Sequence, residues 1–321
     1  MVDRLQQRTS VVVTRIEMIA ESVCLIELAR RDAGDLPVWQ PGAHIELDLM
    51  GRWKRQYSLC GDPADFSRWQ IAVLEEPDSR GGSRYIHRSL KCGDELVASG
   101  PVNRFEFVEA DRYMFVGGGI GITPLIPMLA AAEKAGAEWR LHYGGRSIAS
   151  MSFVNFLQET YGEKVTIVPQ DRDGILDIER LLSSRHADEQ VYCCGPEGLL
   201  DAVETAYNRR DLPDDELHME RFRGTADSSR DGDHPFVVTI ASTGEKITVG
   251  PQCSILTALN SSGYDLDFSC GEGTCGSCET GVIDGVPDHR DSVLSKNERA
   301  SGDTIITCVS RAVGETLTLD L

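Results

Sequence analysis

The sequence is short of positive charge and has no long apolar run, and both shortages exclude classes of protein. Its 32 Lys and Arg residues stand against 51 Asp and Glu, which gives a net charge of −19 at pH 7. Such an acidic chain repels nucleic-acid phosphates and anionic bilayers, so we expect no nucleic-acid or membrane partner. No stretch approaches the roughly 20 apolar residues that span a membrane, and residues 1–13 lack an apolar core of signal-peptide length. We therefore expect a soluble cytoplasmic enzyme or binding protein.

Residue sets that perform hydrolysis are also missing. No Ser-His-Asp set, paired carboxylates or histidine-rich metal site can be recognised, and His87, His142 and His289 are interpreted as structural or surface residues. Of the 321 residues, 41% are hydrophobic, so apolar material suffices for buried cores and the length suits two or three domains. The sequence thus predicts a multi-domain protein.

Ten cysteines are present, and four of them stand apart. The other six are scattered and are interpreted as small apolar residues. The four follow the spacing C-x4-C-x2-C…C, in CGEGTCGSC at 270–278 and at residue 308, which is the plant-type [2Fe–2S] pattern. Glycines between them permit tight turns that bring backbone amides near the sulfides of a cluster. Zinc and unligated structural cysteines are the alternatives; the predicted cluster ligands are Cys270, Cys275, Cys278 and Cys308.

The residues around these cysteines predict a small α+β domain over 236–321. Two strands within 236–250, a helix at 254–263 and closing strands at 304–312 and 315–321 are expected from the apolar periodicity. This segment contains five Lys and Arg against twelve Asp and Glu, a net charge of −7. We expect it to dock on a basic partner surface.

The middle of the chain contains a strand, a glycine loop and a helix in succession, at 113–116, 117–124 and 124–136. In GGGIGITP the glycines allow a phosphate close to the backbone, and the helix start, where Thr123 can cap, offers free N–H groups. Ile122 stands where G-x-G-x-x-G requires its third glycine, so a tight structural turn remains the alternative. The predicted nucleotide contacts are Gly118, Gly119, Gly121 and Thr123.

Further strands at 139–145, 164–170, 191–197 and 217–222 alternate with helices at 152–160, 176–183 and 197–210. This alternation predicts a doubly wound parallel sheet that binds ligands at the carboxyl ends of its strands. Cys194-Gly195-Pro196 follows one such end. Arg146 and Ser147 follow another, where a dinucleotide's adenosine ribose would lie, and no carboxylate occupies that position. A plain turn and a solvated loop arginine are the respective alternatives.

The N-terminal third, residues 10–107, consists of short alternating runs that predict a closed antiparallel barrel. Within Arg55-Gln56-Tyr57-Ser58, Arg55 and Tyr57 share one strand face and Ser58 takes the other. Gly81-Gly82-Ser83 opens a helical turn and forms a second anion nest. Each could be structural by itself. Together they indicate a ligand with one phosphate and a planar ring.

Here the sequence resembles a family. R-x-Y-S, G-G-S, GGGIGITP and C-G-P-E, in this order and followed by Phe222, resemble the ferredoxin-NADP reductase superfamily. With a C-terminal plant-type ferredoxin segment, essentially all 321 residues resemble the phthalate dioxygenase reductase family, which includes reductase components of vanillate demethylase and carnitine monooxygenase. The implied domains are an FMN-binding β-barrel at 1–108, an NAD(H)-binding α/β domain at 109–224, a linker at 225–235 and a [2Fe–2S] ferredoxin domain at 236–321.

The resemblance implies an FMN site in the first domain. Ser58 would hydrogen-bond near the flavin N5 atom, where hydride is exchanged. The other implied contacts are Arg55, Gly82 and Ser83 on the phosphate, Tyr57 on the ring, and Gln56 and Gly81 beside them.

It also implies an NADH site. Thr123 and Cys194 would lie beside the nicotinamide, and Phe222 would cover the flavin face that the nicotinamide must occupy. Arg146 and Ser147 would contact the adenosine end, although related enzymes also hold a 2′-phosphate with such a pair. The catalytic residues implied are Ser58, Thr123, Cys194 and Phe222, and the glycine loops add Gly118, Gly119, Gly121, Gly195 and Pro196.

The resemblance thus implies an NADH-dependent reductase that passes electrons through FMN and [2Fe–2S] to a Rieske-type oxygenase. NADH is expected over NADPH because most family members prefer it. A reductase of a diiron monooxygenase is one alternative, opposed by the C-terminal position of the ferredoxin segment. The other is a nucleotide-binding redox sensor without turnover.

Overall fold

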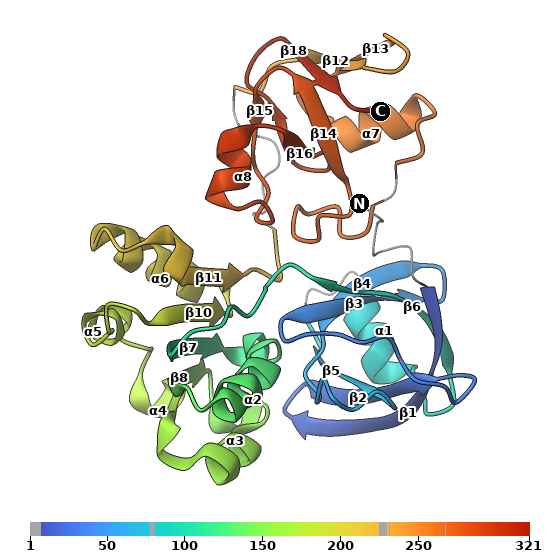
Figure 1. Cartoon of the computed structure of the whole chain (residues 1–321). Coiled ribbons are helices and arrows are strands. Elements are labelled where there is room, and N and C mark those ends of the chain that lie inside the picture. The colour runs from blue at the N-terminus through green and yellow to red at the C-terminus, as the bar shows by residue number, and fades with distance from the viewer. Residues whose placement is uncertain (1–7, 78–80, 225–229, 231, 267) are drawn as a thin grey trace. The chain divides into compact units, whose positions relative to one another are not determined.

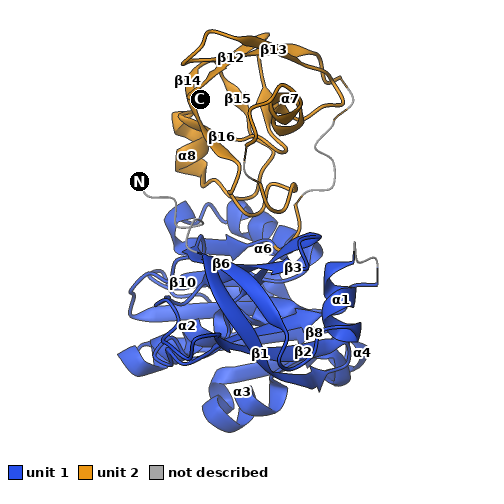
Figure 2. Cartoon of the chain, turned by 90° about the vertical axis from the view of Figure 1, so that its right-hand side faces the viewer, with its two compact units in different colours: residues 1–221 blue, residues 222–321 orange. Residues whose placement is uncertain are grey.

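The computed structural model describes residues 8–77, 81–224, 230, 232–266 and 268–321. The chain divides into two compact units, residues 1–221 and 222–321 (Figures 1 and 2). In the part of the chain that is described, no helix is both long and apolar enough to cross a bilayer. The first unit contains two sheets, and the second contains the remaining strands.

The first sheet of unit 1 is a curled, six-stranded antiparallel sheet in the order β4-β3-β6-β1-β2-β5. Between its end strands the described residues form one isolated bridge, Leu59 with Ile71. The predicted antiparallel barrel is therefore confirmed, but as a half-barrel that closes at a single point. Closure stops there because Asp62 and Asp65 turn the chain away with side-chain to backbone hydrogen bonds. The strands are β1 (Arg8–Ala20), β2 (Val23–Arg30), β3 (Ala43–Leu49), β4 (Trp53–Ser58), β5 (Trp69–Leu74) and β6 (Glu95–Asn103).

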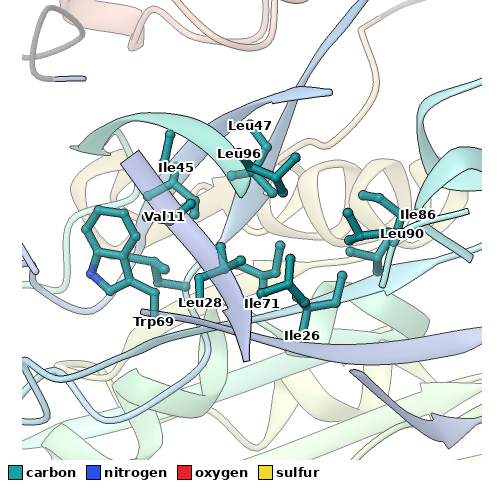
Figure 3. Packing of buried hydrophobic residues seen from close by; sticks show 14 of the residues in the cluster. Val11, Ile26, Leu28, Ile45, Leu47, Trp69, Ile71, Ile86, Leu90 and Leu96 are labelled. Atoms are coloured by element: carbon teal, nitrogen blue, oxygen red, sulfur yellow. The ribbon is translucent and has the colours of Figure 1, made fainter. Parts of the chain in front are cut away.

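Alternation along these strands fills the inside of the curled sheet with apolar side chains (Figure 3). On β3, Ile45 and Leu47 are fully buried and face inward. Helix α1 (Gly82–Arg88) contributes Ile86 to the same cluster. The packing fixes α1, and with it the Gly81–Ser83 segment, against the sheet.

The second sheet of unit 1 is fully parallel, in the order β11-β10-β7-β8-β9. Helices α2 (Leu125–Ala135) and α3 (Val154–Tyr161) pack on one face, and α5 (Ile178–Ser183) and α6 (Glu197–Arg209) on the other. The predicted doubly wound sheet is confirmed, and its strand order reverses between β7 and β10. Its other elements are β7 (Arg112–Gly118), β8 (Glu138–Gly145), β9 (Val165–Pro169), α4 (Gln170–Asp173), β10 (Gln190–Cys194) and β11 (Leu217–Glu220).

Unit 2 is an α+β domain, as predicted, built on a sheet in the order β13-β12-β18-β14-β16. The expected strand over 304–312 is divided into β16 and β17 by the turn that holds Cys308. Strand β14 and helix α8 were not predicted, although Ser295 and Glu298 form a capping box at α8 that the sequence displays. The elements are β12 (Phe236–Ile240), β13 (Lys246–Val249), α7 (Ile255–Ser261), β14 (Glu279–Asp284), β15 (Pro287–Asp288), α8 (Lys296–Ser301), β16 (Thr304–Ile306), β17 (Arg311–Ala312) and β18 (Thr316–Leu319).

The predicted linker at 225–235 lies largely outside the described residues. Its end is described, and Asp233 there is almost fully buried in ion pairs with Arg290, at 2.6 and 2.9 Å. Arg290 also binds Asp288, and Arg311 donates to the His234 carbonyl. Residues 233 and 234 are thus attached to unit 2.

Candidate functional site

The turns that follow β7 and β10 pack directly against each other. A methyl group on Gly121 would lie 2.4 Å from the Cys194 carbonyl oxygen, and one on Gly118 would lie 2.6 Å from Pro196 Cδ. One on Gly195 would lie 3.0 Å from the Gly118 Cα atom. Only glycine permits this approach. The two predicted nucleotide loops are therefore adjacent, at the reversal of strand order where such sheets bind ligands.

The rest of the glycine loop at 117–124 is also tightly turned, but the start of the following helix differs from the prediction. Gly119 has a φ of 52°, a conformation that favours glycine. Thr123 is 2% exposed, and its Oγ1 donates to the Ile120 carbonyl at 3.0 Å. Helix α2 starts at Leu125 after Pro124, without a side-chain cap. The prediction that Thr123 can cap this helix is wrong, because a 3-10 turn precedes the helix and uses the hydroxyl.

A carboxyl group that the sequence analysis missed lies in the same crevice. Glu220 ends β11, opposite Cys194 in the parallel register, and its Oε2 is 4.0 Å from the Cys194 Sγ. It also hydrogen-bonds the side chain of buried Ser58, from the antiparallel sheet. Burial raises the pKa of Glu220 to about 8, against the smaller opposite effect of Ser58. This carboxyl, which contacts both Ser58 and Cys194, is therefore mostly protonated at neutral pH.

Cys194 itself is not an activated nucleophile. It is fully buried, and burial, with Glu220 nearby, raises the pKa of its thiol well above the ordinary value. Because the Cys194 thiol and the Glu220 carboxyl are both neutral, they place no negative charge in this part of the crevice. An electron-rich group can therefore bind there without repulsion.

On the antiparallel sheet the predicted facing of the R-x-Y-S motif is confirmed. Arg55 and Tyr57 pair across β3 with the inward-facing Leu47 and Ile45, and Ser58 lies on the opposite face. The Nε2 atom of Gln56, also on that opposite face, is buried without a hydrogen-bond partner among the described residues. An unpaired buried amide is costly, so a ligand acceptor is expected beside it.

The Gly81–Ser83 segment packs against side chains of β4. A methyl group on Gly82 would lie 2.8 Å from Arg55 Cγ, and one on Gly81, where φ is 111°, would lie 2.6 Å from Trp53. Ser83 Oγ accepts the Glu76 amide at 3.3 Å. A guanidinium beside two side-chain-free residues forms a cradle for a phosphate. Together with Gln56 and Ser58, these residues suit a flavin that carries a phosphate.

Arg146 and Ser147 follow β8, at the same edge of the parallel sheet. Arg146 is exposed. Ser147 and Ser150 form a capping box, in which the Ser147 amide donates to Ser150 Oγ at 3.1 Å. Phe222 begins the second unit and is 39% exposed. Its role over the flavin stays a prediction.

The four predicted ligands of the cluster converge in unit 2. The Cys270 thiol contacts those of Cys275 and Cys308, and Cys278 also contacts Cys308. Cys275, Cys278 and Cys308 are buried, and Cys270 is half-buried. A groove of about 440 Å³, lined in part by Leu256, Phe268, Gly271 and Cys308, reaches this site from the surface.

The backbone of the loop follows the prediction made from its glycines. Gly271, Gly273 and Gly276 have φ values of 67°, 72° and 73°. The Glu272 amide donates to Cys270 Sγ at 3.2 Å and the Ser277 amide approaches Cys275 Sγ at 3.5 Å. Amides aimed at sulfur stabilise added negative charge, which suits a cluster that is reduced.

Comparisons with known proteins agree with this geometry. Residues 238–313 match the 2Fe-2S iron-sulfur cluster binding domain. The chain is 36% identical to the carnitine monooxygenase reductase subunit of Escherichia coli (strain K12), over 98% of this chain and 99% of the relative. The crystal structure of phthalate dioxygenase reductase is 31% identical with a TM-score of 0.72, covering 98% of each chain.

A further structural relative is an intact type IV self-sufficient cytochrome P450 monooxygenase. It is 43% identical over 98% of this chain, with a TM-score of 0.91. This chain spans only 41% of that protein's length. The fold of this chain therefore occurs both as a separate chain and within a longer one.

Proposed function

The chain belongs to the phthalate dioxygenase reductase family, and we propose that it is the NADH-dependent component that feeds a Rieske-type oxygenase through FMN and a [2Fe–2S] cluster. Electron transfer from a reduced pyridine nucleotide through flavin to the cluster, and on to an oxygenase, is the family's function. The observation that carries the proposal is the likeness over 98% of the chain to an oxygenase reductase of nearly equal length. The proposal is more specific than this likeness in three respects: the flavin is FMN, the coenzyme is NADH, and the oxygenase is of the Rieske type.

In this proposal, residues of the first unit bind the flavin and orient the coenzyme. Arg55 and the Gly81–Ser83 segment hold the phosphate, and Ser58 and Gln56 hydrogen-bond the ring. When bound, the flavin takes up hydride as an electron pair and releases electrons singly, as the cluster requires. The adjoining glycine loops at Gly121 and Gly195 would bind the nicotinamide end of the coenzyme.

Glu220 controls the proton and the charge in this crevice. Because its pKa is raised to about 8, its carboxyl is mostly protonated at neutral pH, and it shares a hydrogen bond with the Ser58 side chain. A protonated carboxyl can itself donate, which would leave the Ser58 hydroxyl able to donate toward the ligand. A donor beside the reacting atoms stabilises the negative charge that two-electron reduction brings.

A second candidate is a reductase for a haem monooxygenase. It is favoured by the 43% identity with the matching part of the self-sufficient cytochrome P450 monooxygenase, which exceeds the identity with phthalate dioxygenase reductase. Against it, the relative of nearly equal length is a subunit that serves a separate oxygenase. Reconstitution with a Rieske oxygenase and, separately, with a P450 distinguishes the two by the rate of product formation.

The central test is on the purified holoprotein. We expect extraction to release FMN, and iron and acid-labile sulfide to be present in equal amounts. NADH should reduce ferricyanide and cytochrome c in steady state. Recovery of FAD would overturn the flavin assignment, zinc without sulfide would overturn the cluster, and absence of turnover would favour a redox sensor.

A further inference from the structure

The edge of the parallel sheet where Arg146 and Ser147 follow β8 also contains a carboxylate. It lies far from these two residues in the sequence. Strands β8 and β9 are parallel neighbours, paired through Gly145 and Pro169. The chain after each strand therefore emerges at the same edge. There the Asp171 amide donates to the Arg146 carbonyl at 3.0 Å. The carboxylate absent after β8 is thus supplied after β9.

Some charged side chains at this edge form ion pairs with each other, and others do not. Arg172 binds Asp173 through three contacts of 2.9 to 3.2 Å, so that pair is internally neutral. Arg146 and Asp171 are both exposed. Neither side chain makes a hydrogen bond or ion pair with any residue that the structure describes. One guanidinium and one carboxylate remain available to a ligand.

These two groups favour different coenzymes. A carboxylate accepts hydrogen bonds from the ribose 2′-hydroxyl of NADH, whereas an arginine accommodates the 2′-phosphate of NADPH. A 2′-phosphate carries close to two negative charges at neutral pH and is repelled by a neighbouring carboxylate. Ser147 adds little to phosphate binding, because its hydroxyl donates to Ser150 Oγ at 3.3 Å and its amide donates to the same oxygen.

We propose that Asp171 is a specificity-determining residue, which selects NADH by accepting the ribose 2′-hydroxyl and by opposing the 2′-phosphate that Arg146 attracts. This inference rests on the proposed function and names the group that decides its coenzyme. It also predicts that, without the Asp171 carboxylate, Arg146 would bind the 2′-phosphate of NADPH at this edge.

The test compares Asp171→Asn with wild type and with Glu163→Gln. Glu163 is exposed and precedes β9 at the opposite edge of the sheet, so its variant removes the same charge away from the ligand. Two readouts are used: the ratio of kcat/KM for NADH to that for NADPH with ferricyanide, and the Kd of 2′,5′-ADP against that of 5′-ADP.

We expect Asp171→Asn to lower the kcat/KM ratio and to tighten 2′,5′-ADP binding, each by about tenfold, as expected when one charge stops opposing a phosphate. Glu163→Gln should change neither. Adding Arg146→Ala to Asp171→Asn should cancel the gain. An unchanged 2′,5′-ADP affinity in Asp171→Asn would overturn the inference. Absence of turnover in wild type would instead contradict the proposed function, and the ADP binding still decides the role of Asp171.

Discussion

The crevice of the first unit and the cluster loop of the second are assembled in different ways. Three of the four cluster thiols lie on one nine-residue loop, and that loop supplies its own amide donors. The crevice instead combines Ser58 from the antiparallel sheet with Gly121 and Glu220 from two strand ends of the parallel sheet. A local site tolerates change elsewhere in the fold, whereas the crevice depends on how two sheets pack.

Cys308→Ser tests the local site and has the largest expected effect. Cys308 is the one ligand outside the loop, and a serine alkoxide is a poor ligand for cluster iron. We expect loss of the cluster's visible absorbance and of cytochrome c reduction to background. Reduction of ferricyanide by NADH should stay within about twofold of wild type, because the crevice lies in another unit.

The matched control is Cys253→Ser, which alters a half-buried cysteine of the same unit outside the loop. It should keep both activities. If Cys308→Ser loses the cluster but still reduces a partner oxygenase at the wild-type rate, electrons do not pass through the cluster.

Gly121→Ala tests the crevice and ranks second. Its methyl group would lie 2.4 Å from the Cys194 carbonyl oxygen and must push the two loops apart. A misplacement of about 1 Å near reacting groups costs about 100-fold in rate, so we expect a loss of that size in stopped-flow flavin reduction by NADH. The cluster absorbance should be unchanged.

Gly198→Ala is the control, because a methyl group there meets nothing within 4 Å. It should leave the rate unaltered. A loss below about tenfold in Gly121→Ala would mean that the loops separate at low cost and that their contact does not set the reaction geometry.

The same contrast explains what the sequence could predict. Three of the cluster ligands follow from spacing alone, because their geometry is encoded within nine residues, and Cys308 completes the same sequence pattern. The glycine loops and the facing of Arg55 and Tyr57 follow from strand periodicity. Glu220 and Asp171 could not be found in this way, since each meets its neighbours only through the pairing of parallel strands that are distant in the sequence.

Two fold details were missed for related reasons. The barrel was expected to close fully, but turn residues after Leu59 end the pairing, and turn chemistry decides where a ladder stops. Helix α8 carries a readable capping box, at Ser295 and Glu298, yet its short length gives no apolar period. Local signals therefore predicted the cluster loop, the glycine loops and most strands, but not where the barrel ladder ends or this short helix.

Glu220→Gln tests the proton in the crevice and should have a moderate effect. Above pH 8 the wild-type carboxyl is ionised and opposes the charge that reduction brings, so we expect flavin reduction about tenfold slower at pH 9 than at pH 6.5. The glutamine amide cannot ionise. Its profile should be flat over this range.

The raised pKa also predicts how stability responds to pH. A carboxyl that holds its proton more tightly when folded stabilises the native state below its ordinary pKa of 4.5 and loses that contribution as pH rises to about 8. The free energy of unfolding of wild type should fall over this window relative to Glu220→Gln. Equal pH dependence in both proteins would mean that Glu220 is solvated.

Rising salt should change the rates of electron transfer from the two regions in opposite directions, each by only a few-fold. Residues 236–321 carry a net charge of −7, and two of their five bases, Arg290 and Arg311, are buried in hydrogen bonds and ion pairs. The remaining surface should attract basic cytochrome c, so its reduction should slow about fivefold between 20 and 500 mM salt.

Ferricyanide, an anion that takes electrons from the crevice, is repelled by a chain of net charge −19. Its reduction should therefore quicken over the same salt range. Opposite slopes would show that the two acceptors meet different regions of the protein, with docking on the ferredoxin domain driven by its acidic surface. A cytochrome c rate independent of salt would make that surface a determinant of solubility and leave the groove beside Cys308 to guide the partner.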